Sequence, residues 1–209
     1  MSQPLTPTQL NDAKESLPWD YRDYEAWLDK DVDEEARVGG QCWCICSVPL
    51  ATNINHETPL PNTCDDQWNV LKAAISSDEF PKAQRYIVQH EFKPAKWFPE
   101  FIAKDVELSQ QLLQALEPTV AHIDVGTFDG GFVLNGDSLL PFITAFRSYP
   151  TTYNYRNIDI YSWEFPLVIK IDHHLCIEFI CGGMHLMASI TRVFDSCEIK
   201  YIRGEGFGN

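Results

Sequence analysis

Metal ligands and acid–base groups gather between residues 172 and 185. Nitrogen and sulfur ligands at this density suggest zinc. The spacing argues against a structural zinc site, because such sites commonly use C-x2-C ligand pairs and the chain has none. If 165–180 were one strand, His174 and Cys176 would share a face and His173 would lie on the other. We therefore predict no metal at these residues, which are Asp172, His173, His174, Cys176, Cys181 and His185.

Three cysteines alternate with other residues in the sequence Q-C-W-C-I-C-S-V at 41–48. Strict alternation predicts a strand with Cys42, Cys44 and Cys46 on one face and Trp43 and Ile45 on the other. A nucleophilic thiolate needs a cation, a histidine or a helix N-terminus to lower its pKa. The sequence shows no such neighbour, so we interpret these cysteines as buried sulfur in a strand.

Catalytic motifs are missing from the sequence. A cysteine hydrolase could be assembled from Cys64 or Cys176 with His122 and Asp124, but no nucleophile elbow is present. The chain also has no P-loop, and its glycine-rich G-E-G-F-G stretch at 204–208 is followed by no helix. We therefore predict no catalytic residue and no cofactor. An enzyme that uses His122, Asp124, His173 or His174 as acid–base groups stays open as an alternative.

Acidic and aromatic side chains are interleaved between residues 19 and 35. A surface for a basic protein would combine the two, because aromatics supply binding energy and charges supply steering and specificity. The other interpretation is an ordinary amphipathic helix with its aromatics in the core, since Leu17, Tyr21, Tyr24 and Leu28 form one helical stripe that predicts a helix near 18–30. The predicted partner-binding residues are Asp20, Asp23, Trp27, Asp29, Asp31, Asp33, Glu34 and Glu35.

The sequence L-P-W-D-Y-R-D-Y-E-A-W-L at 17–28, followed by Gly39 and Gly40, resembles the opening of the SUKH family, which includes immunity proteins against bacterial toxins. The resemblance covers residues 17–40 of the 209. It implies an immunity-type function for the chain.

The elements around these candidates mix helices and strands without regular βαβ spacing. Helices are predicted near 18–30, from Thr63 or Asp65 through Ile75, at 105–116 and at 139–146, whereas 184–194 fits either a helix or a strand. Short turns in the second half favour antiparallel pairing. We therefore predict an α+β fold, a mixed or antiparallel β-sheet with helices packed mainly on one face. Strands are predicted at 41–48, 85–92, 119–125, 132–134, 158–163, 165–171, 175–180 and 198–202.

Three parts of the chain differ in composition. Residues 1–40 hold ten acidic and four basic side chains and should form an acidic N-terminal helical segment packed on or extending the core. Residues 41–203 should form the α+β core domain. The glycines that follow predict a flexible tail at 204–209.

The net charge of the 209 residues is −14, with 30 acidic and 16 basic side chains. This charge argues against nucleic-acid binding, which needs Lys and Arg to replace counterions, and it should attract basic proteins. The first ten residues are polar, the cysteines number seven, and no apolar run approaches the ~18 residues of a membrane span. These features predict a cytoplasmic protein without a membrane span.

The leading hypothesis is an acidic cytoplasmic protein-binding protein, an inhibitor or immunity-type protein that masks a basic protein partner such as a toxin. The alternatives are an enzyme with an unrecognised acid–base site, or a zinc-binding α+β domain. The sequence leaves the oligomeric state open.

Overall fold

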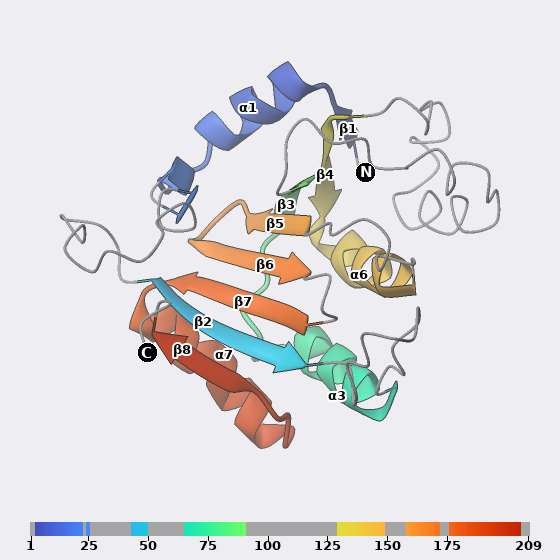
Figure 1. Cartoon of the computed structure of the whole chain (residues 1–209), viewed down its shortest axis with the longest axis vertical. Helices are drawn as coiled ribbons and strands as arrows, with labels where there is room; N and C mark the ends of the chain where they lie inside the picture. Colours follow the sequence, from blue (N-terminus) through green and yellow to red (C-terminus); the bar gives the residue numbers. More distant parts are fainter. Residues whose placement is uncertain are drawn as a thin grey trace, which may run out of the picture.

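A computed structural model describes residues 3–22, 24–25, 43–49, 65–90, 129–148, 158–171 and 176–205. In these ranges eight strands form one antiparallel sheet in the order β1-β4-β3-β5-β6-β7-β2-β8 (Figure 1). The strands are β1 Gln3–Leu5, β2 Trp43–Pro49, β3 Arg85–His90, β4 Gly131–Asn135, β5 Ile158–Ser162, β6 Leu167–Ile171, β7 Cys176–Gly182 and β8 Ile202–Glu205.

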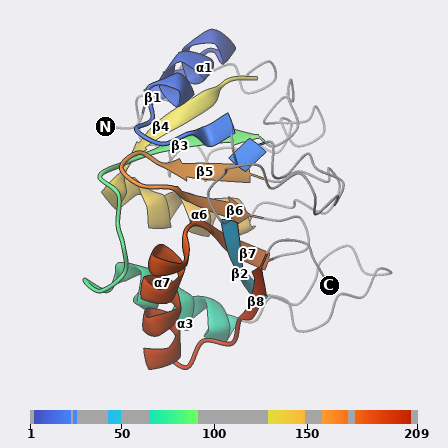
Figure 2. The same cartoon turned by 90° about the vertical axis from the view of Figure 1, so that its left-hand side faces the viewer.

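The helices are α1 Pro7–Glu15, α3 Asp65–Ser76, α6 Leu139–Ser148 and α7 Met184–Ser196, with the 3-10 turn η3 at Gly136–Ser138. Helices α3, α6 and α7 lie together on one side of the sheet, seen edge-on in Figure 2, and α1 packs on the other side. The predicted α+β fold, with helices mainly on one face, is confirmed.

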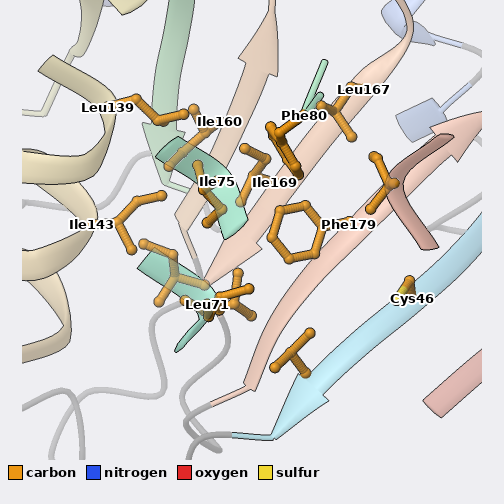
Figure 3. Close-up of a cluster of buried hydrophobic side chains, with 14 of the residues drawn as sticks. Cys46, Leu71, Ile75, Phe80, Leu139, Ile143, Ile160, Leu167, Ile169 and Phe179 are labelled. Carbon is orange, nitrogen blue, oxygen red and sulfur yellow. The ribbon is translucent and has the colours of Figure 1, made fainter. Parts of the chain in front are cut away.

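The larger core fills the space between the sheet and helices α3, α6 and α7. Leu71 and Ile75 of α3 and Ile143 of α6 point toward the strands in the close-up of Figure 3. Phe179 of β7 meets Phe194 of α7 edge-to-face, with 5.1 Å between ring centroids. These side chains are completely or almost completely buried, so together they form the main hydrophobic core.

The opposite face is covered by α1 and the residues that follow it. Thr6 begins α1 with a capping box, since its hydroxyl accepts from the Gln9 amide while the Gln9 side chain accepts from the Thr6 amide. Pro7 occupies the first turn, where its missing N–H costs nothing. Leu10 of α1 is buried against the sheet.

The predicted helix near 18–30 is wrong in its start. Residues 16–20 form turns, and helix resumes at 21–22 and 24–25, with residues 26–30 outside the described part. Asp20 explains the later start, because its carboxylate accepts the backbone N–H of Arg22 at 3.0 Å, as a residue preceding a helix does. Leu17, Tyr21 and Tyr24 of the predicted stripe are all buried on the sheet.

The C-terminal boundary is also corrected. The strand predicted at 198–202 is observed at Ile202–Glu205, so it includes the first two residues of the predicted tail, and residues 206–209 lie outside the described part. The amide of Ile199 bonds back to the Phe194 carbonyl, and Glu198 has a φ of 55°, so residues 198–199 terminate α7 in a left-handed turn.

The other predicted helices and strands in the described ranges are observed, with small shifts at their ends. The helices predicted from Thr63 or Asp65 through Ile75 and at 139–146 are confirmed as α3 and α6, and 184–194 is helical. The predicted strand at 132–134 is observed as β4, which pairs with β1 and β3. The predicted elements at 105–116 and 119–125 themselves lie outside the described residues.

Candidate functional site

The helix-poor face of the sheet carries the described part of the N-terminal segment, residues 3–22 and 24–25. Four aromatic rings, an aromatic cluster, fix this segment to the sheet. Tyr24 lies 5.4 Å from Trp43 and 5.8 Å from Tyr161 between ring centroids, and Trp19 stacks on Tyr161 at 6.1 Å. The Trp19 indole N–H also donates to the backbone carbonyl of Ser162 at 2.9 Å. Ring packing and a satisfied indole together give this segment one defined position.

A buried polar network lies beside the aromatic cluster. The Lys14 ammonium group pairs with the Glu25 carboxylate and donates to the Gln89 side-chain oxygen at 3.1 Å. The Gln89 amide donates to the Tyr161 hydroxyl at 2.6 Å, and that hydroxyl donates to Glu25 at 3.3 Å. Lys14 also lies 4.5 Å from the centre of the Tyr21 ring. The charge of Lys14, which is 3% exposed, is therefore met by a carboxylate, an amide and a π face.

Burial raises the pKa of Tyr161 well above its usual value, and the nearby Asp159 carboxylate adds to the rise. The phenol therefore stays protonated at neutral pH and acts as a hydrogen-bond donor and acceptor, not as a base. The network consequently joins the N-terminal segment to β3 and β5, and we assign it a structural role.

The same face carries a polar row that crosses five strands. In the register of the sheet, Gln89 faces Asp159, Asp159 faces Lys170, Lys170 faces Glu178, and Glu178 faces Ser47. The Ser47 hydroxyl donates to the Glu178 carboxylate at 3.0 Å. Gln89, Asp159 and Lys170 are buried, whereas Glu178 and Ser47 are half-buried. Cross-strand neighbours of opposite charge stabilise a sheet. We therefore interpret the row as a stabilising line of polar side chains on this face of the sheet.

Among the predicted partner-binding residues, Asp20 is exposed in the described part of the chain. The other seven lie outside it: Asp23, Trp27, Asp29, Asp31, Asp33, Glu34 and Glu35. Tyr21 and Tyr24 are buried, so for these two rings the amphipathic-helix interpretation is confirmed. Any contact with a partner on the described part of this segment would rest on its acids and on the half-buried Trp19.

An open depression lies on the outer side of the N-terminal segment. Its lining includes Trp19, Asp20 and the exposed ion pair of Glu15 with Arg22. A carboxylate beside an indole ring suits a cationic side chain, which gains from both. This depression includes Asp20, the predicted partner-binding residue that the structure describes.

The structure describes three of the six candidate metal ligands in the 172–185 stretch, which are Cys176, Cys181 and His185. Cys181 faces the larger core together with Phe179, whereas Cys176 lies at an even position of β7 and so faces the opposite side of the sheet. His185 is exposed on α7. No group of three His, Cys, Asp or Glu side chains in the described ranges is arranged to hold a metal. Asp172, His173 and His174 lie outside these ranges.

The predicted burial of sulfur in β2 is confirmed for Cys44 and Cys46, which share the face of the larger core, and Cys42 lies outside the described part. Burial raises the pKa of Cys46 to about 12, although the nearby Arg203 opposes the rise. Such a thiol is protonated at neutral pH, so it does not serve as a nucleophile. The other members of the hypothetical hydrolase, Cys64, His122 and Asp124, lie outside the described residues.

The Lys14 network was not predicted from the sequence. Lys14 falls on the apolar stripe of α1 and the following turn, four residues after Leu10 and three before Leu17. Gln89 similarly continues the apolar run Ile87-Val88. A polar residue at a core position is the signal that could have marked both side chains as members of a buried network.

No protein-family model matches this chain, and comparison with curated proteins and with solved structures finds no match to either. None of these comparisons extends the resemblance of residues 17–40 to the SUKH family. In the described part of the chain, no helix combines the length and apolar character that crossing a bilayer requires.

Proposed function

We propose that this chain is an acidic cytoplasmic protein-binding protein, an inhibitor or immunity-type protein that masks a basic partner such as a bacterial toxin. The observation that carries the proposal is the net charge of −14, of which the first forty residues contribute ten acidic against four basic side chains. A surface of this charge attracts a basic partner and accelerates the encounter.

The pairing of basic side chains on the N-terminal segment supports this proposal. Lys14 is buried against Glu25, and Arg22 pairs with Glu15 on the surface. Both described basic residues of the segment are therefore engaged within it, while Asp12 and Asp20 are exposed. The outward field of the segment is consequently acidic.

The rigid attachment of the segment also supports the proposal. Trp19 and Tyr24 hold it on the sheet through ring contacts and the indole hydrogen bond to Ser162. A surface that is ordered before binding loses less conformational entropy when the partner arrives. The depression beside Trp19 and Asp20 would receive a Lys or Arg side chain, and the acids from Asp29 to Glu35 would add steering charge.

The first experiment is a pull-down from native lysate at low and high salt, with bound proteins identified by mass spectrometry. A stoichiometric basic partner that salt releases is the expected result, because screening weakens exposed charge pairs. Absence of a partner at both salt concentrations would count against the proposal.

The second experiment locates the surface on the purified partner. A variant with Asp29, Asp31 and Asp33 changed to Asn and Glu34 and Glu35 changed to Gln should bind at least about tenfold more slowly, since steering charge acts on the association rate. The matched control neutralises five exposed acids elsewhere, Asp78, Glu79, Asp129, Asp137 and Glu164. Because both variants change the net charge equally, a similar loss in both would reject the N-terminal surface.

A further inference from the structure

The two outer strands of the sheet differ in what their outer sides offer to another strand. Strand β8, the last strand of the sheet in Figure 1, pairs with β2, and no described strand pairs with its other side. The outer side of such a strand presents N–H and C=O groups to which another strand can bond. At the opposite end of the sheet, Pro4 in the middle of β1 has no N–H to donate, which disfavours further pairing there. Strand β8 contains no proline, so it is the better edge of the described sheet for strand addition.

Exposed apolar side chains lie at the same edge. Three large apolar side chains are exposed in the described ranges, and two of them are Ile202 of β8, 67% exposed, and Met184 of α7, 44% exposed. The Met184 sulfur is 3.9 Å from the Arg203 guanidinium, and it accepts from the thiol of Cys44, which faces Glu205 in the register. Met184 therefore lies over the middle of β8 on the side of α7. Ile202 is next to Arg203 along the strand and so faces the other side of the sheet.

We propose that β8 pairs antiparallel with β8 of a second copy of this chain, around a two-fold axis at Gly204, and that the dimer has one continuous sheet. The charges along the strand support this occupant, because they are complementary to themselves. An axis at Gly204 places Arg203 directly opposite Glu205 of the second copy, and the symmetry repeats the same pair on the other side of the axis. Directly opposed residues of opposite charge stabilise an antiparallel pair.

The other symmetric registers fit the strand less well. An axis at Arg203 or at Glu205 would place two like charges directly opposite each other, which destabilises the pair. An axis at Ile202 would place Gly204 and Glu205 opposite residues 199–200, which lie between α7 and β8 and belong to no strand. The register centred on Gly204 is therefore the one that we propose.

The same symmetry explains the exposure of Met184. The axis of a symmetric antiparallel strand pair is perpendicular to the sheet, so α7 of each copy lies on the same side of the joined sheet. Met184 lies over the middle of β8, close to this axis, so the second copy would cover it. The inference goes beyond the proposed function and does not use the N-terminal segment, so either can fail without the other.

The test is sedimentation velocity of the full chain over a concentration series that reaches about 100 μM, in about 0.15 M salt, where the Debye length of ~8 Å limits the repulsion between two chains of charge −14. The expected result is a concentration-dependent equilibrium between monomer and dimer. Arg203→Glu and Glu205→Arg should each weaken dimerisation at least about tenfold, because each change places like charges opposite each other twice. The double variant that carries both changes restores the opposite charges and should recover the dimer.

The matched control is Lys82→Glu, which changes the net charge as much as Arg203→Glu does, at an exposed residue away from β8, and should dimerise like the wild type. A wild-type chain that stays monomeric throughout the series would overturn the proposal. The same conclusion would follow from an Arg203→Glu dimer as stable as that of the wild type, or from equal losses in Arg203→Glu and Lys82→Glu. A double variant that is folded by circular dichroism but dimerises no better than the single variants would reject the register centred on Gly204.

Discussion

The Lys14 ammonium group reaches from α1 to the Gln89 side-chain oxygen on β3, 3.1 Å away. Both side chains are 3% exposed, and the Glu25 carboxylate completes the charge balance. The contact joins a helix at the start of the chain to an inner strand of the sheet. Much of the attachment of the N-terminal segment therefore depends on one buried cation.

Replacing that cation tests its role. Lys14→Met should lower the free energy of unfolding by about 1–3 kcal/mol, because Glu25 and Gln89 lose a charged partner. Urea denaturation measures this change. The exposed pair provides the control, since Arg22→Ala, with both side chains of the Arg22–Glu15 pair more than half exposed, should cost at most about 1 kcal/mol. Equal losses in the free energy of unfolding for the two variants would show that the buried network stabilises the fold no more than the exposed ion pair does.

The polar row makes a stronger prediction for Lys170. This lysine faces Asp159 on one side and Glu178 on the other, so Lys170→Met leaves two carboxylates without the cation between them. The expected cost is about 3–5 kcal/mol in the free energy of unfolding. Thermal and urea denaturation would measure it, with exposed Lys200→Met as a control expected to stay within about 0.5 kcal/mol. A small loss of stability in Lys170→Met would mean that the charges of Asp159, Lys170 and Glu178 contribute little to the stability of the sheet.

Gly131 tests the packing of α1 on the sheet. A Cβ at this position would lie 2.6 Å from the Val88 carbonyl oxygen and 2.7 Å from a Leu10 methyl carbon. Gly131→Ala should therefore destabilise the fold by about 1–3 kcal/mol, as overpacking does. An unfolding midpoint equal to that of the wild type would show that α1 does not approach β4 so closely.

Alkaline pH should lower the free energy of unfolding, because buried tyrosine hydroxyls resist the ionisation that the unfolded chain undergoes. Burial raises the pKa of Tyr86 to about 12, whereas tyrosine in an unfolded chain ionises near pH ~10. Below pH ~10 both states keep the proton, so this stabilisation is complete; as pH rises from 10 to 12 the unfolded state loses its proton first and stability falls. Urea denaturation at pH 8 to 11 should therefore show a shallower decline in Tyr86→Phe than in the wild type, by up to about 1.4 kcal/mol per pH unit. Identical slopes would contradict the burial of this hydroxyl.

Local patterns predicted the elements with strong periodicity. The stripe of Trp68, Leu71, Ala74 and Ile75 predicted α3, and all four side chains are buried. Helix α1 was missed because it has few apolar residues, and its signal is the capping box of Thr6 with Gln9 instead of a stripe. The strand order could not be predicted from local patterns, since pairs such as β1 with β4 join distant segments and depend on the packing of the whole sheet.

Local patterns likewise predicted only part of the candidate sites. Alternation placed Cys44 and Cys46 on one buried face, but it said nothing about Met184 of α7, whose thioether accepts from the Cys44 thiol. The polar row draws on five strands, and its members are spread along the sequence from Ser47 to Glu178. Its members look like isolated polar residues until the register brings them opposite one another.

The position of β2 has a consequence for biosynthesis. This apolar strand lies between β7 and β8, and its residue Ser47 bonds to Glu178, 131 positions later in the chain. A ribosome adds about 5–20 residues per second, so β2 leaves the exit tunnel on the order of ten seconds before either neighbouring strand exists. During that interval its backbone and its apolar side chains have no native strand to pair with. The nascent chain therefore exposes an unpaired apolar segment, and the sheet closes only after residues 176–205 have been translated.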